Sequence, residues 1–215
     1  RLSAAPVRPR VLSMRERCEV TFAILQRRLD TVLPAAMRDA GLDMWLVLCQ
    51  EDDLDPIFRT MMPMDTWFPI LQILVFHDRG DGGPVERTCL AGTNTHGLYE
   101  QPLPGQRTEP QWRELARIVA EGDPRRIGIN IGSVQWAAGG LTHNLYLQLC
   151  AAIGERYAAR LQSAEPAAVR WLATLIDDEI VLYEHLASGS WGLSLWPCPR
   201  ASMRMSWYSS LSAST

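Results

Sequence analysis

Met44-Trp45-Leu46-Val47-Leu48-Cys49 is an unbroken apolar run that lies between Gly41 and an acidic loop. A continuous apolar stretch of this length, bounded by turn residues, predicts a strand that is buried on both faces of a sheet. A second apolar run predicts another strand over residues 69–77, and residues 78–83 are rich in Asp and Gly, which predicts a turn. Residues 85–90 then return as the hairpin partner of that strand.

Apolar residues at helical spacing flank these strands. They predict helices over residues 14–40, 111–121 and 142–153. Pro34 should kink or divide the first helix, and Gly41 and Gly154 should end the first and the third. Thr142 is a candidate N-cap. Two more short strands are predicted, over residues 126–131 and 157–161. Strands that alternate with helices, plus one hairpin, predict an α/β fold: a three-layer mixed sheet with helices on both faces.

The composition divides the chain into four parts. Residues 1–13 are expected to form a flexible N-terminal segment, and residues 14–163 one domain. Residues 164–187 read as a helical linker, with helices over 167–173 and 177–186. Residues 188–215 contain three Trp, many Ser and no acidic residue, and they show no periodicity. We expect this tail to be irregular.

The overall composition is that of a globular protein. Of 215 residues, 47% are apolar and 21% are charged, which argues against a disordered chain. The net charge of −3 gives no electrostatic reason to expect a nucleic-acid partner. No apolar run approaches the length of a membrane span. All 21 basic residues are Arg, which suggests GC-rich coding DNA.

The cysteines give no disulfide framework, because five is an odd number and no two form a Cys-x-x-Cys pair. Cys49 and Cys89 fall in apolar runs and are expected to be buried, inert thiols. We favour a cytoplasmic location. A periplasmic or secreted location stays open if a leader precedes residue 1.

No residue pattern predicts a catalytic or metal centre in this chain. The four histidines are far apart in sequence and match no ligand motif; they are His77, His96, His143 and His185. The acidic run over residues 51–55 lacks the regular spacing of a calcium loop. Asp55 and Arg59 follow the end of a strand, where loops of such sheets reach outward, so they are the candidates for facing a substrate pocket. An ordinary ion pair within the loop is the alternative for these two residues.

Several short segments, in this order and spacing, resemble the N-terminal domain of creatinase, prolidase and aminopeptidase P-type metallopeptidases. The segments are Arg27-Arg28-Leu29-Asp30, Leu33-Pro34, Met37-Arg38, Gly41-Leu42-Asp43-Met44-Trp45-Leu46-Val47, Asp55-Pro56-Ile57-Phe58-Arg59, Trp112-Arg113-Glu114-Leu115, Arg126-Ile127-Gly128-Ile129-Asn130, Ala164-Glu165 and Val169-Arg170-Trp171-Leu172. The resemblance covers residues 16–186.

The resemblance implies a creatinase N-terminal domain-like fold with a ribonuclease H-like motif. In that family the N-terminal domain is non-catalytic, supports homo-oligomers and shapes access to the substrate pocket. A separate "pita-bread" domain binds two divalent metal ions, such as Mn, Co or Zn, and hydrolyses peptides that often carry Pro after the cleaved bond. None of its metal-ligand motifs occurs in this sequence. The resemblance therefore implies an inactive fragment, with no cofactor of its own, that meets a peptide substrate only together with the missing domain.

The tail allows a test of this idea. Met203-Arg204-Met205-Ser206-Trp207-Tyr208 constrains its own DNA, because Met and Trp each have one codon. With G or C at the flanking third positions, another frame can read Asp-Ala-Asp-Val-Val-Val, and a Pro-Gly-Val can precede it. This pattern is similar to the start of the family's catalytic domain. We hypothesise a frameshift, real or artefactual, between residues 186 and 196.

Two other functions stay open. One is a stand-alone α/β binding or oligomerisation module, which a discrete, saturable partner or ligand would favour. The other is a small α/β hydrolase or transferase whose site is invisible in sequence, which a convergent His/Asp/Cys cluster would favour. If a domain is missing, the surfaces that would face it should be apolar and should promote association.

Overall fold

A computed structural model describes residues 12–68, 70–103 and 108–183. The chain separates into two compact units. One spans Leu12–Ile176, and the other contains residues 1–11 and 177–215. Within the second unit, residues 177–183 are helical. The predicted irregular tail over residues 188–215, the predicted flexible residues 1–11 and the proposed frameshift lie outside the described residues.

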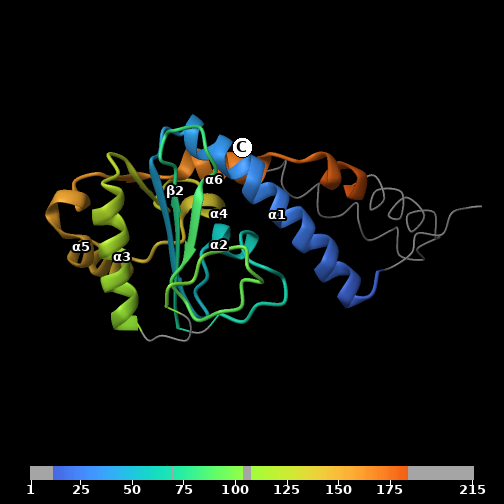
Figure 1. Ribbon diagram of the computed structural model, residues 1–215, viewed down its shortest axis with the longest axis horizontal. Coiled ribbons are helices and arrows are strands. Elements are labelled where there is room, and N and C mark those ends of the chain that lie inside the picture. Colours follow the sequence, from blue (N-terminus) through green and yellow to red (C-terminus); the bar gives the residue numbers. More distant parts are fainter. Residues whose placement is uncertain (1–11, 69, 104–107, 184–215) are drawn as a thin grey trace, which may run out of the picture. The chain divides into compact units, whose positions relative to one another are not determined.

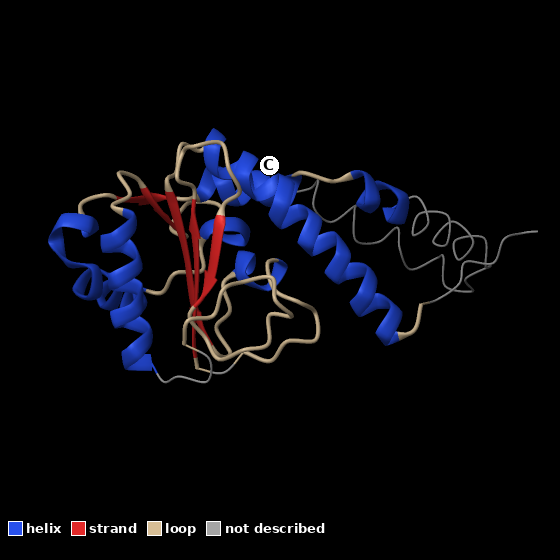
Figure 2. Cartoon of the chain, viewed as in Figure 1, coloured by secondary structure: helices blue, strands red, loops and turns tan. Residues whose placement is uncertain are grey.

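The first unit is built around one five-stranded sheet (Figures 1 and 2). Its elements are α1 (Met14–Asp39), β1 (Met44–Gln50), α2 (Pro56–Thr60), β2 (Leu71–His77), β3 (Glu86–Cys89), α3 (Thr108–Gly122), β4 (Ile127–Ile129), α4 (Gln135–Ala138), α5 (His143–Ala158), β5 (Leu161–Ser163) and α6 (Glu165–Ala173). The strand order is β3-β2-β1-β4-β5, with β1 antiparallel to β2 and parallel to β4. The sheet is therefore mixed, as predicted.

Alternate side chains of β1 enter two separate cores, because successive residues of a strand point to opposite faces. Met44, Leu46 and Leu48 pack with α3 and α5 on one face. Trp45 and Val47 face α1, α2, α4 and α6 on the other (Figure 1). The predicted arrangement of helices on both faces is confirmed, and the run Met44–Gln50 is buried at every position except its last.

The first helix ends where the sequence predicts, in a Schellman motif. Gly41 takes the left-handed conformation, with φ of +65°, which only Gly adopts without strain. The N–H of Leu42 donates to the carbonyl of Met37, and that of Gly41 donates to Arg38. The expected division at Pro34 is wrong, since α1 runs through Pro34 without a break. The neighbouring side chains of Leu33 and Met37 are fully buried, and this packing offsets the lost backbone hydrogen bond.

Two boundaries differ from the prediction. The strand expected over residues 157–161 is wrong at its start, because α5 continues to Ala158 and β5 begins only at Leu161. The compact unit also extends to Ile176 and includes α6, whereas the sequence analysis assigned residues 164–187 to a linker. In the part of the chain that the structure describes, no helix is long and apolar enough to cross a membrane.

Gly154 interrupts α5 with φ of 76° and ψ of 166°, a backbone conformation that is essentially restricted to Gly. No other atom lies near the position of an added Cβ, so the cost of a side chain there is backbone strain alone. We expect Gly154→Ala to lower the free energy of unfolding by about 1–3 kcal/mol, measured by urea denaturation. Gly82→Ala is the variant to compare with Gly154→Ala, because Gly82 also has a positive φ but lies in an exposed turn outside any helix. An unchanged free energy of unfolding for Gly154→Ala would show that Gly154 does not adopt this backbone conformation.

Candidate functional site

Asp55 lies in a buried hydrogen-bonded network at the carboxyl ends of the parallel strands β1 and β4. Its Oδ1 accepts the backbone N–H of Ile57 at 2.8 Å and that of Phe58 at 3.3 Å, so it caps α2. The Nδ2 group of Asn130 donates to both Asp55 oxygens at 2.9 Å. Trp45 in turn donates from Nε1 to Asn130 Oδ1 at 2.8 Å. The network therefore joins three segments that are far apart in sequence.

The Asp55 carboxyl is closed off from solvent. Its residue has no exposed surface, and a Cβ on Gly140 would lie only 2.1 Å from Asp55 Oδ2. Gly140 is thus needed for the turn after α4 to cover the carboxyl. Burial raises the pKa of Asp55, and hydrogen bonds from Asn130, Ile57 and Phe58 offset part of that rise. In this arrangement Asp55 organises the interior of the fold.

The two residues that the sequence nominated for a substrate pocket are not brought together. Arg59 is exposed on α2, whereas Asp55 points inward to Asn130. The alternative of a loop ion pair is also absent, since no such contact joins these two described residues. The acidic residues 51–53 before them are exposed.

A cavity of about 410 Å³ lies between the first turns of α1 and two loops. Four residues of α1 line it, together with Asp65 and His96 from the loops after α2 and β3; the four are Arg15, Cys18, Glu19 and Phe22. Its volume falls in the range of small-molecule sites. The sequence does not reveal this cavity, because its six residues come from three separate segments.

His96 is held firmly at the edge of this cavity. Its Nε2 lies 3.0 and 3.1 Å from the two oxygens of Asp65, and its ring meets Phe22 edge to face with centroids 5.9 Å apart. The backbone of His96 has φ of +50°, which is uncommon outside Gly, and its N–H donates to Asn94 Oδ1 at 3.0 Å. Thr66 ties the two loops together by donating to the carbonyl of Asn94 at 2.9 Å. The imidazole–carboxylate pair therefore rests on braced loops.

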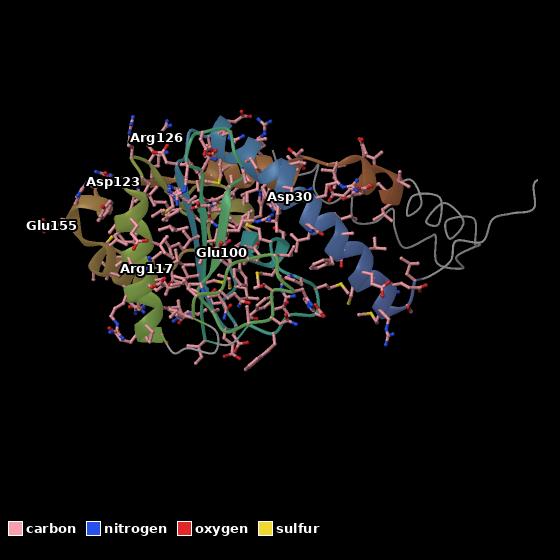
Figure 3. All side chains as sticks on the ribbon, in the orientation of Figure 1. Asp30, Glu100, Arg117, Asp123, Arg126 and Glu155 are labelled. Carbon is pink, nitrogen blue, oxygen red and sulfur yellow. The ribbon has the colours of Figure 1, made fainter. Side chains whose placement is uncertain are left out.

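A second, mostly polar cavity of about 230 Å³ lies beside the β2–β3 hairpin and α3. His77 is nearly buried there, with Nδ1 3.4 Å from Glu86, and Arg79 donates to Glu86 at 2.6 Å, which lowers the pKa of that carboxyl. Glu100 and Arg117, labelled in Figure 3, also line it. Its opposite charges are largely paired with one another, as in the contacts of Arg79 with Glu86 and of Arg117 with Glu121.

Neither cavity suits a metal ion. Across residues 12–68, 70–103 and 108–183, no group of three or more His, Cys, Asp or Glu side chains is arranged to hold one. The residues present therefore do not fit the two-metal centre that the family resemblance implies for its catalytic domain. Burial raises the pKa of Cys49 to about 12 and that of Cys89 to about 11, so these two thiols are expected to be unreactive.

Comparisons with known proteins leave the family open. No family model matches this chain, and neither a curated protein nor a solved structure matches it.

Proposed function

We propose that this chain carries the non-catalytic N-terminal domain of an Xaa-Pro aminopeptidase or prolidase-like metallopeptidase. In this proposal, peptide hydrolysis requires a separate domain that binds two divalent metal ions. The intact parent protein, which contains both domains, is a homo-oligomer. The chain of 215 residues contributes a scaffold rather than a reaction centre.

The observation that carries the proposal is that the short segments behind the resemblance contact one another in space. Trp45, Asp55 and Asn130 come from three of these segments, and they form the buried hydrogen-bonded network around the Asp55 carboxyl. Each makes a polar contact that the others depend on, because a buried polar group without a partner costs about 1–3 kcal/mol. These contacts join the three segments in one core, which supports the proposal.

Two more of the segments behind the resemblance contact each other, one in α1 and the other in α6. The Arg28 guanidinium lies 4.5 Å from the ring centroid of Trp171 and donates to the carbonyls of Trp171 and Thr174. Trp171 is fully buried, and its Nε1 donates to Thr60 at 2.8 Å. Arg170, from the same segment, pairs with Asp39 at the end of α1. The last matched segment is therefore an integral part of the domain.

The sheet topology is compatible with the fold that the resemblance implies. The order β3-β2-β1-β4-β5, with β2 antiparallel to β1 and with β4 and β5 parallel to it, supports a ribonuclease H-like motif. This topology is one that many functions share, so it adds support only alongside the residue contacts.

The test is to assay the purified chain for hydrolysis of Xaa-Pro peptides with Mn²⁺, Co²⁺ or Zn²⁺, and to measure its bound metal by mass spectrometry. We expect no hydrolysis and no stoichiometric metal, because the described residues offer no metal-ligand set. Stoichiometric metal together with peptidase activity in this chain alone would refute the proposal.

One observation favours the alternative of a stand-alone binding module. The cavity beside α1 is built from braced loops and a helix face, and it does not depend on a second domain. A small ligand that binds this cavity saturably would support that function.

A further inference from the structure

The cavity beside α1 has one chemically mixed wall. Arg15, Cys18, Glu19 and Phe22 follow the spacing i, i+3, i+4 and i+7, so they lie on one face of the helix. Asp65 and His96 form the facing wall. One cation, two carboxylates and an aromatic ring therefore border a single small volume.

The charges on the helix face are available to a ligand. Neither the Arg15 guanidinium nor the Glu19 carboxylate forms an ion pair or hydrogen bond with any residue that the structure describes, although their spacing would allow a pair on one helix face. Asp65 is already oriented by His96, and it lines the same cavity from the facing wall. A bound molecule would thus meet one positive and one negative side chain on the helix face and the Asp65 carboxylate on the facing wall.

The apolar part of the cavity is fixed as well. Phe22 is half-buried, and its ring is locked edge to face against His96. Cys18 lies one turn before it on the same helix face. These two side chains offer a surface for a small aliphatic group next to the charged positions.

We propose that this cavity binds a free α-amino acid with an apolar side chain. The ligand's carboxylate would pair with Arg15, its ammonium group with Glu19 and Asp65, and its side chain would lie on Phe22 and Cys18. Recognition needs both charges at once, because a ligand with a single charge would leave either Arg15 or the carboxylates of Glu19 and Asp65 without a partner and so gain little over water. This inference does not depend on the family proposal.

The test uses three probes of nearly equal shape on the full chain: L-leucine, leucinamide, which lacks the carboxylate, and 4-methylpentanoate, which lacks the amine. We expect calorimetry to give leucine a Kd of about 1 mM or tighter, and to give both truncated probes at least about tenfold weaker binding. Equal binding of the three probes, or no binding of leucine, overturns the proposal.

The alkylation rate of Cys18 reports where leucine binds. Bound leucine should slow iodoacetamide labelling of Cys18, measured by peptide mass spectrometry, and leave that of Cys150 on α5 unchanged. Binding without protection of Cys18 would place the ligand elsewhere and overturn the proposal.

Two exposed substitutions separate the roles of the charges. Arg15→Gln should remove the preference for leucine over leucinamide, and Glu19→Gln should reduce the preference for leucine over 4-methylpentanoate. Arg113→Gln, an exposed arginine on α3, is the matched control and should bind leucine as the unmodified chain does. Unchanged preferences in both cavity variants would contradict the assignment.

Discussion

Replacing Trp171 by Ala should lower the free energy of unfolding by about 3–5 kcal/mol, a large share of the stability of an ordinary domain. The Trp171 ring is fully buried in the core that α1 and α6 share, and its removal leaves a cavity. The same change takes away the ring beneath the Arg28 guanidinium and the donor to Thr60. Urea denaturation followed by far-ultraviolet circular dichroism measures the effect.

Trp136→Ala is the matched control, because Trp136 is 61% exposed on α4. It should change the free energy of unfolding by no more than about 0.5 kcal/mol. A loss for Trp171→Ala as small as that of Trp136→Ala would mean that α6 does not pack into the domain. In that case residues 164–176 would belong to a linker, as the sequence analysis expected.

Asp55→Ala should cost about 2–4 kcal/mol of unfolding free energy. The change removes the cap of α2 and leaves the amide of Asn130 without its acceptor in the interior. Asp53→Ala, in the same loop but exposed, should have little effect. Asp55→Ala and Asn130→Ala combined should cost less than the sum of the two single changes, because each breaks the same contact. Additive costs would contradict the network.

The pH dependence of Asp55 follows from its raised pKa. A carboxyl whose folded-state pKa lies above its unfolded value stabilises the fold below the unfolded pKa, and this contribution is lost as pH rises through the folded pKa. We therefore expect the stability difference between the unmodified chain and Asp55→Asn, which does not titrate there, to shift against the unmodified chain as pH rises above about 4. A difference that stays constant with pH would mean that the pKa of Asp55 is not raised by folding.

The strands and main helices were predictable because their signals are local. The apolar run Met44–Gln50 needs no partner to be recognised as a buried strand, and Gly41 ends α1 through its own backbone freedom. The start of β5 was predicted wrongly, because its three half-buried residues at the sheet edge show no alternation of apolar and polar side chains. Tyr157, which precedes them, fits a helical pattern equally well. There the tertiary contacts decide the boundary.

The site was harder to predict, because its contacts are long-range. Asp55 was expected at an outward-reaching loop, but Asn130, 75 residues later, draws its carboxyl into the interior. The α1 cavity depends on Asp65 and His96 meeting helix residues that lie more than 40 residues earlier in the chain. Only the spacing of residues 15, 18, 19 and 22 was visible in sequence, and it indicates a helix face without showing what lies opposite.

The proposal that this chain is the N-terminal domain of a metallopeptidase is tested most directly by the nucleotide sequence downstream of the Leu186 codon. The chain is then expressed with the alternative frame restored. We predict that this frame encodes Pro-Gly-Val, an acidic stretch and then Asp, His and Glu metal ligands, and that the joined protein cleaves Xaa-Pro peptides only with divalent metal. A single uninterrupted reading frame, with these motifs encoded in neither of the other two frames, would contradict the proposal that this scaffold belongs to a metallopeptidase.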